Sequence, residues 1–159
     1  MASADKVKMR LAGTDGIEDG AEDTVNQLTD IPWVITLAAD GATSTAIAIT
    51  KSFTNPFDFT LKVVSVGVSA GAGVTADATN NATTVISTDN GADSAPATAA
   101  QLVTDVAGGN WVTDILKAFT LTPANCLLPP GGNLFYTQTK AASGVQLPVR
   151  NIVVRMRRV

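Results

Sequence analysis

The sequence predicts an all-β fold, an antiparallel β-sandwich of the jelly-roll type that follows an extended N-terminal arm. Three observations support this prediction. Threonine occurs 21 times, and Thr together with Val favours strands over helices. The 13 Gly and 7 Pro are spread along the chain as turn residues. Short runs with an apolar period of two follow one another at spacings of about ten to fifteen residues.

The 159 residues are enough for one domain with a core of its own. We place this domain at residues 31–159 and the arm at residues 1–30. The first strand is Trp33–Ala38, followed by a turn at Ala39–Gly41. In the next strand, Thr45–Thr50, isoleucines alternate with small residues, and Asn55-Pro56 then forms a turn.

The longest strand is expected from Phe57 to Ala70. Its run from Val63 to Val68 is apolar on both faces, which predicts a central strand that is covered on both sides. Gly67 is read as the mark of a bulge or bend. The polar loop that follows contains Asp77 and several Asn and Thr, which can bind their own backbone in turns.

The next strand is Thr84–Thr88, and the pattern then weakens. From Asp89 to Gly109 we expect a loop with one short element, either a helix or a strand. Residues 111–122 fit a helix at their start and a strand at their end. Two further strands, Leu134–Thr139 and Leu147–Val159, have an Ala-Ala-Ser-Gly turn between them. In the last strand, Ile152, Val154 and Met156 share one face, and Val153, Arg155, Arg157 and Val159 share the other.

Charge is divided between the two ends of the chain. Seven of the 14 acids lie in residues 1–30, whereas four of the five Arg lie in the last ten residues. We expect the acidic arm to be mobile or to order only against a partner. The C-terminal Arg cluster is expected to dock on an acidic surface, such as the arm of a neighbouring subunit, or to be the solvated face of an edge strand.

Several classes of function are disfavoured. The chain has no His and a single cysteine, Cys126, so the common catalytic triads, a disulfide framework and multi-Cys metal sites are excluded. We read Cys126 as a buried small side chain and expect no enzyme activity, cofactor or metal. A net charge of −3 argues against nucleic acid and anionic membranes. No run is long enough to span a membrane or act as a signal peptide, so we expect synthesis in a cytosol.

Two segments of the sequence resemble those of a known protein family. The segment from Val63 to Thr88, with its loop Thr75-Ala76-Asp77-Ala78-Thr79-Asn80, is similar to a strand–loop–strand unit in small structural proteins of tailed-bacteriophage virions. The segment from Leu127 to Arg158 is similar to the closing strand pair of the same proteins. The likeness covers roughly residues 33–158 and leaves out the arm, for which there is no matching family motif.

The resemblance implies a capsid decoration (cement) protein or a head-fibre module with a jelly-roll β-sandwich. Such a subunit, often a homotrimer, sits on the capsid surface of the virion. There it binds the major capsid protein and stabilises the shell, after synthesis in the host cytoplasm. The candidate residues for contacts to the capsid or to other subunits are Asp15, Glu18, Asp19, Glu22, Asp23, Trp33, Trp111, Arg155, Arg157 and Arg158.

The alternative is a carbohydrate- or receptor-binding module of a phage fibre or spike, with a host-surface glycan as its ligand. Such sites use exposed aromatic rings, and Trp33, Trp111 and Tyr136 are the candidates. Trp111, at the end of a Gly-rich loop, is the better of these, and its other reading is packing in the core or at a subunit interface.

Overall fold

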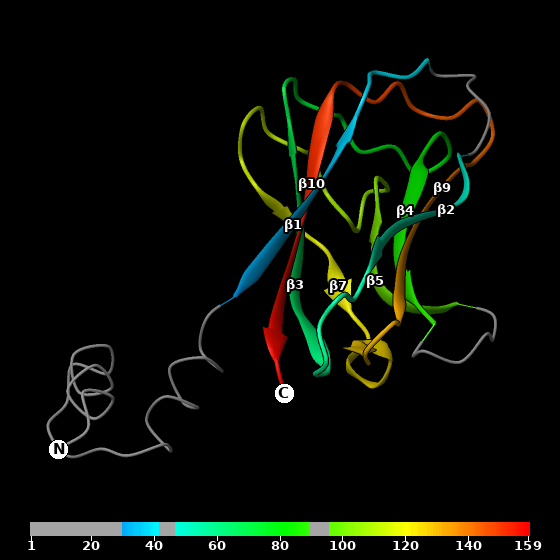
Figure 1. The fold of residues 1–159 in the computed structure, drawn as a ribbon. Helices are drawn as coiled ribbons and strands as arrows, with labels where there is room; N and C mark the ends of the chain where they lie inside the picture. Colours follow the sequence, from blue (N-terminus) through cyan, green and yellow to red (C-terminus); the bar gives the residue numbers. More distant parts are fainter. Residues whose placement is uncertain (1–29, 42–46, 90–95) are drawn as a thin grey trace, which may run out of the picture.

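The structure, a computed structural model, describes residues 30–41, 47–89 and 96–159. It is an antiparallel β-sandwich, as predicted (Figure 1). The strands, with one short 3-10 helix (η1, Pro123–Asn125), are β1 (Ile31–Leu37), β2 (Ile47–Thr54), β3 (Leu61–Ala70), β4 (Ala82–Thr88), β5 (Ala97–Val103), β6 (Lys117–Ala118), β7 (Thr120–Leu121), β8 (Leu127–Leu128), β9 (Asn133–Lys140) and β10 (Arg150–Arg158). The acidic arm lies outside the described residues, and so does Lys6–Leu11, where alternating apolar residues allow a short strand.

The strands form two sheets. The first, which we call the β10 sheet, has the order β1-β10-β3-β6, and β8 also pairs with β3. The second, the β9 sheet, has the order β2-β9-β4-β5-β7. Neighbouring strands are antiparallel throughout. β1 and β2 are edge strands of their sheets, and we call the side of the sandwich where they lie its open side (Figure 1).

The core lies between the sheets and follows the predicted alternation most clearly in β10. Ile152, Val154 and Met156 are completely buried, whereas the residues between them face outward. Leu134 and Tyr136 on β9 supply the opposing layer. Each fully buried aliphatic side chain of this kind contributes about 1.5–3 kcal/mol relative to an exposed one.

β3 is a central strand, as predicted, but its outer face is only partly covered, and a β-bulge explains the misleading pattern. The register with β10 shifts at Val64, so that Leu61 and Val63 face the core below the bulge and Val66 and Val68 face it above. The change of phase places apolar residues at both odd and even positions without covering both faces. The strand also begins at Leu61 rather than Phe57.

Gly67 is not the bulge residue that the sequence indicated. It lies on the outer face of β3, where a Cβ atom would be only 2.7 Å from Cγ of Leu116. The glycine therefore lets the side chain of Leu116 rest on the sheet. The side chain of Leu116 thus buries Gly67 on the outer face of β3.

The weakly patterned segment after Asp89 contains a full strand, β5, which is paired on both sides by β4 and β7. Its inward residues include Ala99 and Ala100, which are completely buried but too small to give a clear hydrophobic period. The helix considered at the start of residues 111–122 is absent. Asp114 has φ = 58°, outside the helical region, and the segment ends in the short strands β6 and β7.

Candidate functional site

Two polar regions stand out among the described residues. One is an exposed surface on the outer face of the sheet near the end of β10, which we call the basic surface and define as Lys62, Arg155 and Arg157. The other is a buried network between the sheets, centred on Asp40 and Arg150. The predicted site residues Asp15, Glu18, Asp19, Glu22 and Asp23 lie outside the described residues.

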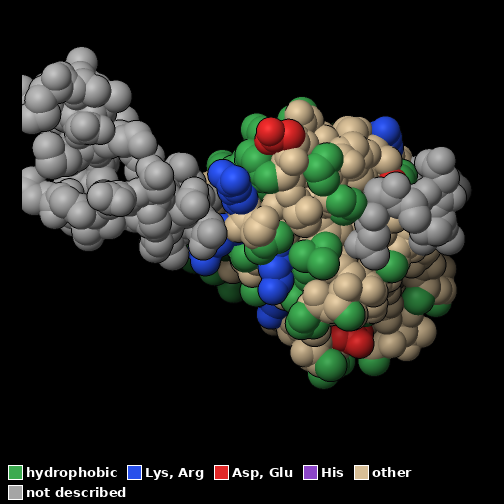
Figure 2. All heavy atoms as spheres, turned by 60° about the horizontal axis from the view of Figure 1, so that its bottom comes forward, with side chains coloured by type: hydrophobic (Ala, Val, Ile, Leu, Met, Phe, Trp, Pro, Cys, Tyr) green, Lys and Arg blue, Asp and Glu red, His purple; other side chains and the backbone are tan. Residues whose placement is uncertain are grey.

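The basic surface forms because β10 and β3 bring their cations together. Arg155 and Arg157 alternate with buried residues and therefore face outward. Lys62 on β3 lies directly opposite Arg157 in the register. In Figure 2, which brings the bottom of Figure 1 forward, Lys and Arg side chains gather in one part of this face among hydrophobic ones.

Exposed apolar residues lie at the same end of the sheet, where Leu127 is opposite Lys62 in the register and Arg158 contacts an aromatic pair. The guanidinium of Arg158 lies 4.8 Å from the ring centroid of Phe59, and that ring stacks on Phe57 with centroids 4.9 Å apart. Leu127 and Val159 are 44% and 58% exposed. A surface that combines cations with exposed apolar area is typical of a contact surface for another macromolecule.

Trp33 lies at the open side of the sandwich. Its ring packs on Phe53 of β2 with centroids 4.9 Å apart, so it links the edge strands of the two sheets, and it remains 37% exposed. Trp33 can therefore contact a partner molecule only together with the neighbouring residues of the β1 and β2 edge.

Trp111 is a core residue, which corrects its reading as a surface contact or a sugar-stacking residue. It is only 4% exposed, and its backbone pairs with Val74 through two hydrogen bonds of 2.8 and 3.1 Å. Its ring is not available to a ligand or a partner in this fold. Tyr136, 2% exposed, is likewise inside.

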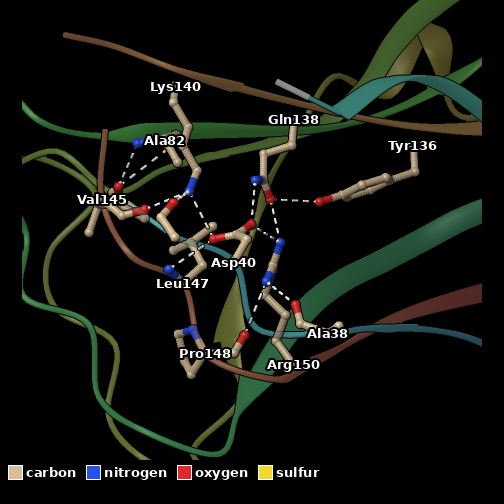
Figure 3. Close-up of polar contacts among 12 residues, drawn as sticks. Ala38, Asp40, Ala82, Tyr136, Gln138, Lys140, Val145, Leu147, Pro148 and Arg150 are labelled. Carbon is tan, nitrogen blue, oxygen red and sulfur yellow. Dashed lines mark hydrogen bonds and ion pairs between the residues drawn. The ribbon is translucent and has the colours of Figure 1, made fainter. Parts of the chain in front are cut away.

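Arg150 does not belong to the C-terminal surface cluster. It is the first residue of β10 and is 2% exposed, on the same inner face as Ile152. Its Nη2 donates to Oδ2 of Asp40 at 3.1 Å and to Oε1 of Gln138 at 2.6 Å, and its Nη1 donates to two backbone carbonyls (Figure 3). These acceptors offset the cost of burying the guanidinium, whose Nε is the one nitrogen left without a hydrogen-bond partner.

Asp40 is the shared acceptor of this network (Figure 3). One carboxylate oxygen accepts from Lys140 Nζ at 2.8 Å and from the backbone N–H of Leu147 at 3.0 Å. The other accepts from Gln138 and Arg150. Burial alone would raise the pKa of Asp40, but the hydrogen bonds and the charge of Arg150 outweigh it and hold this pKa below its usual value.

This network connects parts of the sandwich that are distant in sequence. It joins the loop after β1, the side chains of β9, and the loop before β10. Because each charge has a partner and the carboxylate is held ionised, the arrangement is suited to bracing the sheets rather than to exchanging protons. Sequence reasoning missed it, since Asp40 reads as a turn residue and Arg150 as part of a basic tail.

The loop that carries the family resemblance is a hydrogen-bonded turn, as expected. Oδ1 of Asp77 accepts from the backbone N–H groups of Thr79 and Asn80, each at 2.7 Å. These bonds, with that from Asn80 the stronger influence, lower the pKa of Asp77. Its carboxylate therefore shapes the loop.

Other features that could indicate a reactive thiol, a metal site or a ligand pocket are weak in the described part of the chain. Cys126 is buried, as expected, and burial raises the pKa of its thiol. No group of three or more metal-binding side chains occurs among the residues described. A hollow of about 480 Å³ beside Leu147 and Gly71 has no charged side chain in its walls. In the ranges described, no helix is long and apolar enough to cross a membrane.

Comparison with known proteins gives no match: no family model, curated protein or solved structure is similar to this chain. The class of protein that the fold defines is an antiparallel β-sandwich, and its outer face carries an exposed surface that is basic and partly apolar.

Proposed function

We propose that this chain is a non-enzymatic structural protein of a tailed-phage virion, a capsid decoration subunit. It binds the major capsid protein at the outer surface of the shell and stabilises the shell as a homotrimer. The proposal starts from the resemblance in the segments Val63–Thr88 and Leu127–Arg158. It is argued further from the topology and from the position of the basic surface.

The strand order is the observation that carries the proposal. The three two-residue strands β6 to β8 can be counted as one interrupted strand. The sandwich then has eight strands in sequence. The sheet orders become first-eighth-third-sixth and second-seventh-fourth-fifth-sixth, because β7 of the interrupted sixth strand pairs with β5. This alternation between sheets supports a jelly roll, an architecture used by viral capsid and lectin domains.

The contact surface supports a docking role. Arg155 and Arg158 are exposed, Arg157 is half-buried, and exposed Leu127 lies opposite Lys62 in the register. Asp30, where the arm meets the sandwich, is paired with Arg157. Residue 30, the last of the arm, therefore lies beside the basic surface.

The burial of Trp111 and Tyr136 favours decoration over glycan binding. Of the three aromatic residues considered for a sugar site, only Trp33 retains substantial exposure, and its ring is shared with Phe53. A lectin site built on stacking would need a free aromatic face.

The test is addition of the purified chain to phage particles that lack it, followed by sedimentation. We expect saturable co-sedimentation with the particles. Deleting residues 1–29 should abolish binding while circular dichroism still reports a folded β-sandwich. A chain that does not bind particles but is retained on a glycan array would contradict the proposal. Unchanged binding after the deletion would remove the arm from it.

A further inference from the structure

The outer edge of β1 is a long, regular sheet edge without charge. Within the described ranges β1 pairs only with β10, in an unbroken register over all its seven residues, none of which is charged. The other edge strand of the open side, β2, has an exposed Lys51 and a register with β9 that shifts twice. The edge strands β6, β7 and β8 have two residues each. Sheet edges are commonly protected by charge, bulges or shortness, and β1 has none of these.

The backbone groups of Trp33 are used inside the sheet. The N–H of Phe119, next to β6, donates to the carbonyl of Val66 at 2.9 Å, so this carbonyl of β3 points away from β10. Val66 and the opposite residue of β10, Val154, are therefore a non-hydrogen-bonded pair. The backbone groups of Val154 accordingly point to the other side, where they pair with Trp33 of β1.

The backbone groups of Pro32, Val34 and Thr36 point to the outer edge, because the direction alternates along a strand. Pro32 fits this placement, since a proline in a strand is tolerated where its nitrogen faces out of the ladder. The edge therefore offers the N–H groups of Val34 and Thr36 and the carbonyls of all three residues. No described strand lies beside it.

The side chains of β1 complement those of a second β1 that is related by a two-fold axis at Val34. Such an axis places Trp33 opposite Ile35 of the partner subunit, and Ile31 opposite Leu37 of the partner subunit. Aromatic–β-branched and aliphatic pairs of this kind stabilise antiparallel strands. Trp33 and Val34 are 37% and 51% exposed, so both have surface to bury in the contact.

The backbone groups match in the same register. Each Val34 would donate its N–H to the carbonyl of Val34 of the partner subunit, as in any hydrogen-bonded antiparallel pair. The N–H of Thr36 would meet the carbonyl of Pro32 of the partner subunit. Because Pro32 has no N–H, only the carbonyl of Thr36 is left without a bond in this pairing.

We propose that β1 pairs with β1 of a second copy of this chain, antiparallel and about a two-fold axis at Val34, so that the two β10 sheets become one continuous sheet. A second copy is favoured over an unrelated strand because every cross-strand pair from Ile31 to Leu37 is uncharged and in phase. This contact uses the same edge of both subunits and closes with two copies. The inference goes beyond the proposed function, since a two-fold contact joins two subunits whether or not each belongs to a trimer.

The first experiment compares masses by analytical ultracentrifugation of the full chain. Val34→Lys places two like charges directly opposite each other at the axis, where they repel. We expect the native chain at high concentration to have about twice the mass of this variant. Val106→Lys is the matched control, because Val106 is an exposed valine in the turn after β5, on the other sheet, and it should keep the native mass. Circular dichroism checks that each variant is folded.

The second experiment tests the register by cross-linking and does not depend on the lysine variant. A two-fold axis at Val34 places the two Cα atoms of this residue about 5.5 Å apart, which suits a disulfide. Val34→Cys should therefore give a covalent dimer on mild oxidation. Thr36→Cys is the matched control, since the two copies of this residue are offset by about 13 Å along the strands. The native chain should not cross-link, because Cys126 is buried.

Three results would overturn the proposal. One is a native chain with the same mass as Val34→Lys at every concentration. Another is equal cross-linking of Val34→Cys and Thr36→Cys, which would contradict the two-fold register. The third comes from amide hydrogen exchange by NMR. Slow exchange of Val34 and Thr36 in a chain of monomer mass would assign the edge to another segment of the same chain.

Discussion

Replacing Asp40 by Ala should destabilise the sandwich strongly, because Asp40 is the common counter-charge of Arg150 and Lys140. The side chain of Arg150 is 1% exposed and that of Lys140 is 5% exposed, whereas Asp40 retains 16%. Removing one partner of a buried pair typically costs about 3–5 kcal/mol because the other charge stays buried. Partial access of water to this site reduces our expectation to about 3 kcal/mol.

For a chain of this length, that loss corresponds to a fall in Tm of about 6–12 °C. Chemical denaturation followed by far-UV circular dichroism gives the free energy of unfolding directly. Asp58→Ala is the matched control, since Asp58 is an exposed acid in a loop of the same sandwich, and it should change stability by less than about 0.5 kcal/mol. A loss below about 1 kcal/mol for Asp40→Ala would refute the idea that this network braces the two sheets.

Three further predictions concern the same fold. The pKa of Asp40 is lower in the folded state than in the unfolded state. The stabilisation from ionised Asp40 is therefore present above the unfolded pKa and is lost as pH falls through the folded pKa. Asp40→Asn should accordingly reduce the fall of the unfolding free energy at acidic pH. Asn55→Ala should cost about 2–4 kcal/mol in urea unfolding, because this buried amide donates to three backbone carbonyls, whereas a cost below 1 kcal/mol would contradict that role. Gly108→Ala should lower Tm much more than Gly67→Ala. A Cβ at Gly108 would meet the carbonyl oxygen of Val103 at 1.8 Å, whereas at Gly67 it meets only a flexible side chain, and equal losses would contradict this packing.

Much of the architecture could be predicted from local pattern. The alternation in β10 identified its inward face, because large aliphatic residues give a clear period of two. The element after Asp89 could not be assigned as helix or strand, because the core contacts of β5 use Ala99 and Ala100, whose hydrophobic signal is small. The phase change in β3 was misread, since a single extra residue at Val64 mixes the two faces.

The buried network could not be found from sequence. Asp40 and Arg150 are 110 positions apart, and each has an ordinary local interpretation as a turn residue or a tail cation. Only the pairing of β1 with β10 and of β9 with its neighbours places them together. The outward orientation of Arg155 and Arg157, in contrast, followed from the strand period alone.

The measurement that tests the central claim most directly is the thermal stability of particles with and without this protein. Particles that lack the protein are heated in the presence of a DNA-binding dye, either alone or after saturation with the purified chain. We predict that saturation raises the temperature at which packaged DNA becomes accessible, and that the neutral variant Arg155→Gln/Arg158→Gln raises it less. An unchanged release temperature at demonstrated saturation would contradict the assignment of this sandwich as a stabilising decoration subunit.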